Sequence, residues 1–249
     1  MLADHALPVY RTARYTTFGE STRAQETWFV LHGYGQLARD FLLAVEPAFR
    51  STPTFLVAPE GHSRYYLPGH ATVGASWMTR DFRDEEIGDY VRLLEAVADD
   101  VATAVPSPGA ASRPLSWDPF RGHGPSEPVN SPDPTYRDRP TPGSQTGLLG
   151  FSQGAATACR WLVGSERRFR RVILWGGLLP PDTDIDRFAG SVENSDLVLV
   201  AGLQDAIVAP RIDAEVSRLD AAGIRHRVVR YEGGHALDPE LLRSLVTPV

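Results

Sequence analysis

The chain has 249 residues, of which 42 % are hydrophobic and 22 % charged, an ordinary globular composition that can bury a core without disulfides or metals. Its net charge of −6 and its scattered arginines would repel a phosphate backbone, so we expect no nucleic-acid partner. It has neither a basic start followed by an apolar run nor about 18 consecutive apolar residues, so we expect a cytoplasmic protein without an integral membrane segment.

Strand and helix signals alternate along the first hundred residues. β-branched and aromatic residues predict strands within Val9 to Phe18, at Thr27 to Leu31 and at Thr54 to Ala58. Apolar residues recur at intervals of three and four from Leu37 to Phe49 and from Glu85 to Thr103, which predicts two helices. This order is typical of a parallel sheet covered by helices.

Residues 106 to 142 interrupt the alternation. This window holds ten of the 20 prolines and no apolar periodicity. Because proline lacks an N–H donor and has a fixed φ, neither helix nor sheet is expected there. We interpret it as a mobile insertion in one domain spanning 1–249. By topology it should leave and re-enter at the amino-terminal edge of the sheet, so we do not expect it to act as a lid over a site at the other edge.

The alternation resumes beyond the insertion. The predicted strands are Thr146 to Leu149, Arg171 to Trp175, Leu197 to Ala201 and Arg227 to Tyr231, and the predicted helices are Ala155 to Val163, Arg211 to Ala222 and Pro239 to Leu245.

Gly150-Phe151-Ser152-Gln153-Gly154 is a Gly-x-Ser-x-Gly pentapeptide between a predicted strand and a predicted helix. That is the setting of a nucleophile elbow, in which a serine occupies a strained turn and the glycines avoid collisions around it. The start of the helix also directs backbone N–H groups at a developing anion. We therefore predict Ser152 as the nucleophile. The alternative is an ordinary turn of small residues.

A serine hydroxyl needs a base to remove its proton, and in α/β-hydrolases the chain order is Ser, then Asp or Glu, then His. Two of the seven histidines follow Ser152, namely His226 and His235. His226 lies at the start of a predicted strand, where its side chain would face the sheet or solvent. His235 follows the end of that strand, on a loop that faces the same crevice as the elbow. We predict His235 as the general base.

The carboxylate that orients the histidine is expected at the same edge of the sheet. Asp205 lies just past the apolar strand Leu197 to Ala201, which places it there. Its alternative roles are a solvated loop carboxylate or a helix cap. Other aspartates lack this placement because they precede that strand or lie on or after the next helix: Asp182, Asp184, Asp186, Asp196, Asp213 and Asp220.

A glycine-containing loop follows the strand that ends at Leu31. In His32-Gly33-Tyr34-Gly35 the glycines let the backbone approach a substrate carbonyl. The expected oxyanion-hole donors are the backbone N–H groups of Tyr34 and of Gln153, the residue after the nucleophile. We interpret His32 as structural, because another histidine already fills the acid–base role.

Together these motifs resemble the phospholipase/carboxylesterase branch of the α/β-hydrolases, which includes acyl-protein thioesterases and bacterial carboxylesterases. The most specific match is the Gly-Phe-Ser-Gln-Gly string, and the matches span most of the chain apart from the insertion. They are Leu31-His32-Gly33-Tyr34-Gly35, Val57-Ala58-Pro59, Ala75-Ser76-Trp77-Met78, Gly150 to Gly154, Asp205 with Val208 and Pro210, and Gly233-Gly234-His235.

The resemblance implies an α/β-hydrolase fold, with a mostly parallel sheet and helices on both faces. It also implies hydrolysis of carboxylic esters or thioesters through an acyl-enzyme, without metal or cofactor. We expect a small-molecule ester or thioester substrate, and a monomer or homodimer. The chain departs from the family at Gln36, where an acidic residue is common, in its insertion, and in the segment Asp205 to Pro210, which is one residue longer.

Residues after the second core strand are candidates for the substrate pocket. Tyr65, Tyr66, Trp77 and Met78 lie on predicted loops at the active-site edge. The alternative is that Trp77 and Met78 pack beneath the loop.

Two other functions remain open on the same fold. A serine peptidase or acyltransferase would use the same machinery, because acyl transfer to another acceptor needs the same groups. A non-enzymatic binding protein would normally have lost one of the three polar residues, and this chain retains all three.

Overall fold

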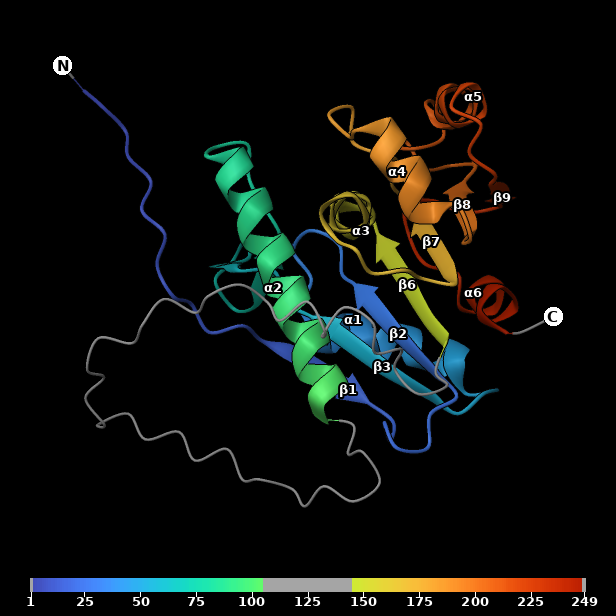
Figure 1. The fold of residues 1–249 in the computed structure, drawn as a ribbon, viewed down its shortest axis with the longest axis horizontal. Coiled ribbons are helices and arrows are strands. Elements are labelled where there is room, and N and C mark those ends of the chain that lie inside the picture. The colour runs from blue at the N-terminus through green and yellow to red at the C-terminus, as the bar shows by residue number, and fades with distance from the viewer. Residues whose placement is uncertain (1, 105–144, 248–249) are drawn as a thin grey trace.

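The computed structural model describes residues 2–104 and 145–247, and the expected insertion at 106–142 lies outside the described residues (Figure 1). A central sheet has seven strands, β1 (Tyr15–Phe18), β2 (Glu26–Leu31), β3 (Thr54–Pro59), β6 (Gln145–Phe151), β7 (Arg171–Trp175), β8 (Asp196–Gly202) and β9 (Arg227–Tyr231). The helices are α1 (Ala38–Val45), the 3-10 helix η1 (Glu46–Phe49), α2 (Arg83–Ala104), α3 (Gln153–Gly164), α4 (Ile185–Val192), α5 (Ile212–Ala221) and α6 (Pro239–Val246). No helix of the described chain is long and apolar enough to cross a membrane.

The strands lie in the order β1-β3-β2-β6-β7-β8-β9, and every neighbouring pair is parallel except β1 with β3. The carboxyl ends of β2 and of β6 to β9 therefore lie at one edge of the sheet. The predicted mostly parallel sheet is confirmed. Because the expected strand within Val9 to Phe18 forms only from Tyr15, the antiparallel edge strand is short.

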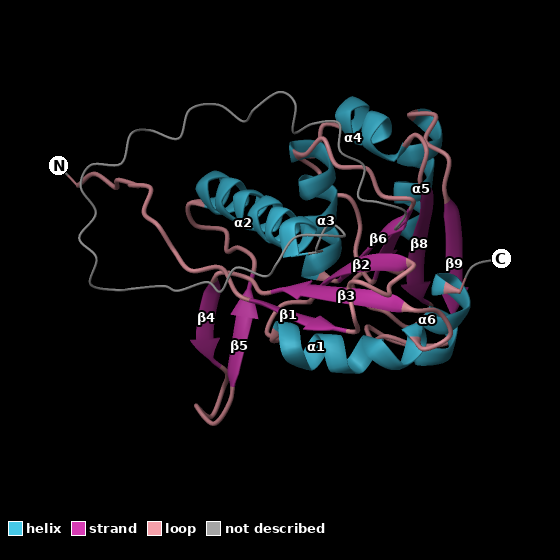
Figure 2. Cartoon of the chain, turned by 60° about the horizontal axis from the view of Figure 1, so that its bottom comes forward, coloured by secondary structure: helices cyan, strands magenta, loops and turns pink. Residues whose placement is uncertain are grey.

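Helices cover both faces of the sheet, as predicted: α2, α3, α4 and α5 lie on one face, and α1 and α6 on the other (Figure 2). Alternate residues of each strand enter separate hydrophobic clusters, so that Phe29 and Leu31 of β2 pack with the first group, and Trp28 and Val30 with the second. Burial on both faces explains why the strands are almost continuously apolar.

A β-hairpin and a helix were not predicted from the sequence. The hairpin of β4 (Ser63–Tyr66) and β5 (Val73–Ser76) forms a separate two-stranded sheet, and its connecting turn contains Gly69 and His70 at positive φ. Helix α4 begins after Asp184, whose side chain accepts a hydrogen bond from the Arg187 N–H. The N-cap and the spacing of Ile185, Phe188 and Val192 are sequence signals for this helix that our interpretation missed.

A substitution at Gly147 tests the packing of the sheet. Gly147 lies opposite Trp28 in the β2–β6 pair, and a Cβ there would overlap the indole. Trp28 is buried and packs edge-on against Phe49, with ring centroids 5.2 Å apart, so it has little room to retreat. We expect Gly147→Ala to lower the free energy of unfolding by about 1–3 kcal/mol, measured by urea denaturation.

The matched control is Gly190→Ala. Gly190 lies inside helix α4 and has open space where a Cβ would go. Because alanine is the better helix former, this change should raise the free energy of unfolding by up to about 1 kcal/mol. Equal effects of the two changes would contradict the packing assigned to Gly147.

Candidate active site

Three side chains from distant parts of the chain meet at the carboxyl edge of the sheet. His235 Nε2 lies 2.8 Å from Ser152 Oγ, and His235 Nδ1 lies 2.7 Å from Asp205 Oδ2. Ser152 follows β6, Asp205 follows β8 and His235 follows β9. His226 lies at the other end of β9, where Nδ1 is 2.9 Å from the carbonyl oxygen of Ile224. The structure therefore brings His235, and not His226, to Ser152.

Ser152 occupies a turn that an L-residue rarely adopts, with φ 55° and ψ −114°. Its N–H donates to the Trp175 carbonyl across the sheet, at 2.8 Å. The flanking glycines permit the turn, because a Cβ on Gly150 would overlap the backbone of Gly154, and one on Gly154 would overlap the backbone of Leu31. Backbone strain of this kind is held by surrounding structure and is concentrated at functional sites.

Asp205 is 1 % exposed, and its hydrogen bonds compensate for the burial of its charge. Oδ1 accepts from the N–H groups of Ile207, at 2.8 Å, and Val208, at 3.1 Å. Burial by itself would raise the pKa of this carboxyl, but the hydrogen bonds from His235 and from these two N–H groups outweigh it and hold the pKa below its ordinary value. An ionised Asp205 favours the histidine tautomer with its proton on Nδ1, which leaves Nε2 free to accept from Ser152.

Two hydrogen bonds from backbone N–H groups hold the loop after β2. The Gly33 N–H donates to Gln36 Oε1 and the Gly35 N–H to the Ala75 carbonyl, both at 2.8 Å. Within the described chain, no hydrogen bond engages the N–H of Tyr34, which lies between them. The Tyr34 ring is 63 % exposed at the same edge.

His32 supports this loop from beneath. It is fully buried, with Nδ1 2.8 Å from the Gly33 carbonyl, and Nε2 accepts from the Gly61 N–H at 3.0 Å. The Trp77 ring stacks on it at 4.8 Å and donates to its carbonyl oxygen. Burial lowers the pKa of His32 to about 4, although its contact with Gly33 opposes the shift. His32 therefore remains neutral at neutral pH and bonds to the backbone of Gly33 and Gly61.

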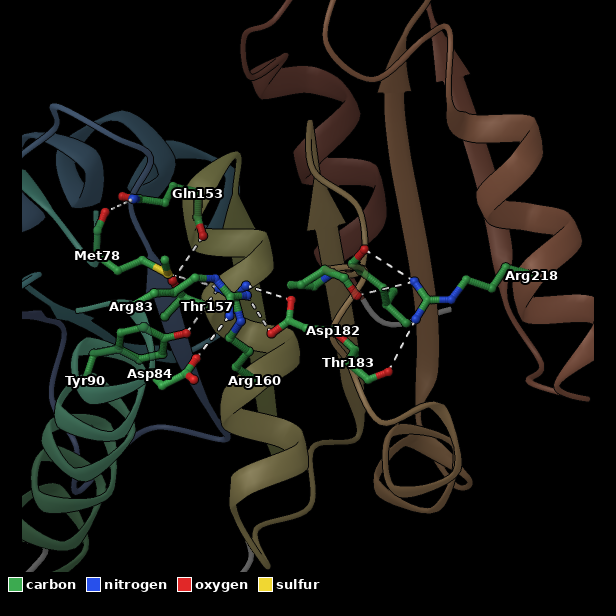
Figure 3. A network of polar contacts seen from close by, with 12 residues as sticks. Met78, Arg83, Asp84, Tyr90, Gln153, Thr157, Arg160, Asp182, Thr183 and Arg218 are labelled. Atoms are coloured by element: carbon green, nitrogen blue, oxygen red, sulfur yellow. Dashed lines mark hydrogen bonds and ion pairs between the residues drawn. The ribbon is translucent and has the colours of Figure 1, made fainter. Parts of the chain in front are cut away.

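The Gln153 side chain ties the elbow to the segment after β5 (Figure 3). Its amide nitrogen donates to the Met78 carbonyl at 2.9 Å. Arg160, two turns further along α3, contacts the Met78 sulfur at 3.2 Å and Asp182 at 3.2 Å, and Asp182 also pairs with Arg83 at 2.6 Å. This network joins α2, α3 and the loop after β7 beside the elbow. No local motif marks residues so far apart, so this network was not predicted from the sequence.

The four residues predicted for a substrate pocket have different environments. Trp77 is 1 % exposed and lies in the core, as the alternative interpretation has it, and Met78 is half-buried against Arg160. Tyr66 is exposed beside His70. Tyr65 lies against the loop after β2, with its ring 5.5 Å from that of Tyr34.

The chain matches one family model and several solved structures. The family model described as Serine hydrolase (FSH1) matches residues 24–240. No curated protein sequence matches. Among solved structures, esterase PE8 is 20 % identical, with a TM-score of 0.63 over 94 % of this chain and 96 % of that chain. Acyl-protein thioesterase 2 of Zea mays is 18 % identical, with a TM-score of 0.57 over 92 % and 94 %.

A phospholipase/carboxylesterase of Dyadobacter fermentans is 16 % identical, with a TM-score of 0.58 over 95 % of this chain and 96 % of that chain. These structures confirm the predicted α/β-hydrolase fold. Together with the serine hydrolase family model, they confirm the resemblance inferred from the motifs.

Protonation of His32 should destabilise the fold in acid. Its pKa is about 4 when folded and about 6.5 when exposed, so the unfolded chain binds the proton more tightly. The stability from neutral His32 is complete above about pH 6.5 and is lost as the pH falls toward about 4. Between pH 7 and 4, the parent should lose about 3 kcal/mol more unfolding free energy than His32→Gln, measured by urea denaturation.

The control for this comparison is His5→Gln, in the exposed amino-terminal segment. It should retain the pH dependence of the parent. Parallel pH profiles for the parent and His32→Gln would contradict the role assigned to His32.

Proposed function

Because this chain belongs to the FSH1 family of serine hydrolases, we propose that it cleaves carboxylic esters, thioesters included, through an acyl-enzyme formed on Ser152. The observation that carries the proposal is the pair of hydrogen bonds that links Asp205 through His235 to Ser152. The likeness to esterase and thioesterase structures supports ester hydrolysis as the reaction. Ester and thioester carbonyls both suit this chemistry.

In the proposed reaction, His235 Nε2 removes the Ser152 proton as Oγ attacks the substrate carbonyl carbon. Asp205 stabilises the imidazolium that results. The tetrahedral intermediate collapses when His235 gives that proton to the departing alcohol or thiol. Water then attacks the acyl-enzyme with His235 again as base, which releases the acid and restores Ser152.

The negative oxygen of each tetrahedral intermediate is proposed to bind the backbone N–H groups of Tyr34 and Gln153. Gln153 is the first residue of α3, so its N–H belongs to the helix start, where backbone donors have no intrahelical acceptor. Two preorganised donors stabilise the transition state more than the neutral carbonyl of the substrate. The exposed Tyr34 ring and the adjacent Tyr65 are proposed to contact the substrate beside this hole.

The nucleophile is tested by Ser152→Ala. Turnover of short-chain p-nitrophenyl esters should fall by roughly 10³-fold to 10⁶-fold with the melting temperature preserved, because the oxyanion donors and the fold remain. Ser244→Ala on helix α6 is the control and should keep full activity. A fluorophosphonate that labels the parent at any residue other than Ser152, located by peptide mass mapping, would falsify the assignment.

The orienting carboxylate is tested by Asp205→Asn. An amide at this position cannot stabilise the imidazolium and favours the wrong histidine tautomer, so kcat should fall by roughly 10³-fold to 10⁴-fold. Asp213→Asn removes an exposed carboxylate on α5 and should leave kcat unchanged. Activity of Asp205→Asn within about tenfold of the parent would rule out this role. Assays of the parent with amide substrates, and with other acyl acceptors in place of water, would show whether it acts as a peptidase or an acyltransferase.

A further inference from the structure

The loop that carries His235 is rich in glycine, yet a general base must be held to within a fraction of an ångström. The segment Glu232-Gly233-Gly234-His235-Ala236 connects β9 to the turn before α6. Glycine allows many backbone conformations, so local sequence does not hold the imidazole in place. Tertiary contacts must supply that restraint.

Tyr231, the last residue of β9, contacts the loop on both sides of His235. Its hydroxyl is 3.0 Å from the carbonyl oxygen of Gly234 and also donates to that of Ala236. These are the residues immediately before and after His235. The hydroxyl therefore ties the backbone around the imidazole to the end of a strand.

A second donor reaches one of these carbonyls from another strand of the same sheet. The indole N–H of Trp175, at the end of β7, donates to the Ala236 carbonyl at 2.9 Å. Trp175 is fully buried, and its ring lies 5.5 Å from that of Tyr231. Two aromatic donors thus share one carbonyl acceptor next to His235.

The loop before His235 is joined to the loop that carries Asp205. The Gly233 carbonyl accepts from the Gln204 N–H at 2.9 Å, and this bond links the two loops. A Cβ on Gly202 would overlap the carbonyls of Gly233 and Gly234, which explains the glycine at the end of β8. The His235 ring itself is held by Asp205 at Nδ1 and packs against the Phe151 ring at 5.2 Å, whereas the backbone that carries the ring depends on the contacts on either side of His235.

We propose that Tyr231 is a positioning residue for the reaction, and that its hydroxyl, backed by the Trp175 indole, holds His235 Nε2 at hydrogen-bond distance from Ser152. The inference rests on the proposed function of Ser152 and His235. Without the hydroxyl, Gly234 and Ala236 lose a donor and the imidazole can rotate away from the nucleophile. The loss should appear in the chemical steps more than in substrate binding.

The test is Tyr231→Phe, which removes one oxygen and keeps the ring. With p-nitrophenyl esters, kcat per labelled active site should fall about tenfold while KM changes by less than about twofold. Active sites are counted by fluorophosphonate titration, so a smaller folded fraction is not mistaken for a slower reaction. The matched control is Tyr15→Phe on the remote strand β1. It removes a hydroxyl that donates to Asp100 of helix α2, and it should keep the parent kcat.

A second variant tests whether the two donors act on the same carbonyl. In Trp175→Phe the Tyr231 hydroxyl still donates to the Ala236 carbonyl. The double variant, Tyr231→Phe with Trp175→Phe, removes both donors from this carbonyl. The double variant should therefore lose more kcat than the product of the single losses. If Trp175→Phe does not fold, the Tyr231→Phe comparison still decides the proposal.

A kcat per labelled site within twofold of the parent would overturn the role of Tyr231. So would a loss confined to the number of titratable sites, which is the result expected of a merely structural hydroxyl. Failure of the proposed function has a different signature, because the parent itself would then not be labelled at Ser152.

Discussion

The parallel pairing of β2 with β6 and of β6 through β9 is the constraint on which the site depends. Because these strands run in one direction, the loops after them leave at one edge, and residues as far apart as Ser152 and His235 become neighbours. Burial on both faces fixes the register, since a shift by one residue would exchange Trp28 and Phe29 between the two hydrophobic clusters. Packing of the core therefore fixes the positions of the strand ends that carry the site.

Backbone segments come unusually close to one another around Ser152. Ser152 is held at positive φ between two glycines, and a Cβ on Gly177 would overlap the Ser152 carbonyl. Conformations of this kind cost on the order of 1–3 kcal/mol each, and the packed strands on either side hold them. The surrounding core thus stabilises a turn that the local sequence alone would not adopt.

Charge at the site is controlled by burial together with specific donors. Asp205 keeps its charge although buried, because two backbone N–H groups and His235 all donate to it. His32 is equally buried, but its partners in the described part of the chain are backbone groups and not a carboxylate, and it is neutral. Asp182, between Arg83 and Arg160, has a pKa of about 2: burial opposes the shift, and the two guanidinium groups outweigh it. Neighbouring groups thus decide which of these three residues are ionised.

Local sequence was sufficient for the elbow and for the positions of the central strands along the chain. Gly150 to Gly154 places Ser152 between a strand and a helix, and the apolar runs mark every strand of the central sheet except the full extent of β1. The choice of His235 over His226 followed from which end of β9 each occupies. These features depend on spacing within a few residues, which sequence shows directly.

Tertiary structure alone decided the side chains that support the site. Trp77 was a pocket candidate from its place in the sequence, but it packs on His32 in the core. Tyr231 and Trp175 are unremarkable strand residues in the sequence, and their shared contact with Ala236 exists only because β7 and β9 lie on either side of β8. Trp175 is 61 positions from Ala236 and Tyr231 is 5 positions from it, yet both donate to the same carbonyl. No local sequence pattern marks this arrangement, because strand order and packing determine its geometry.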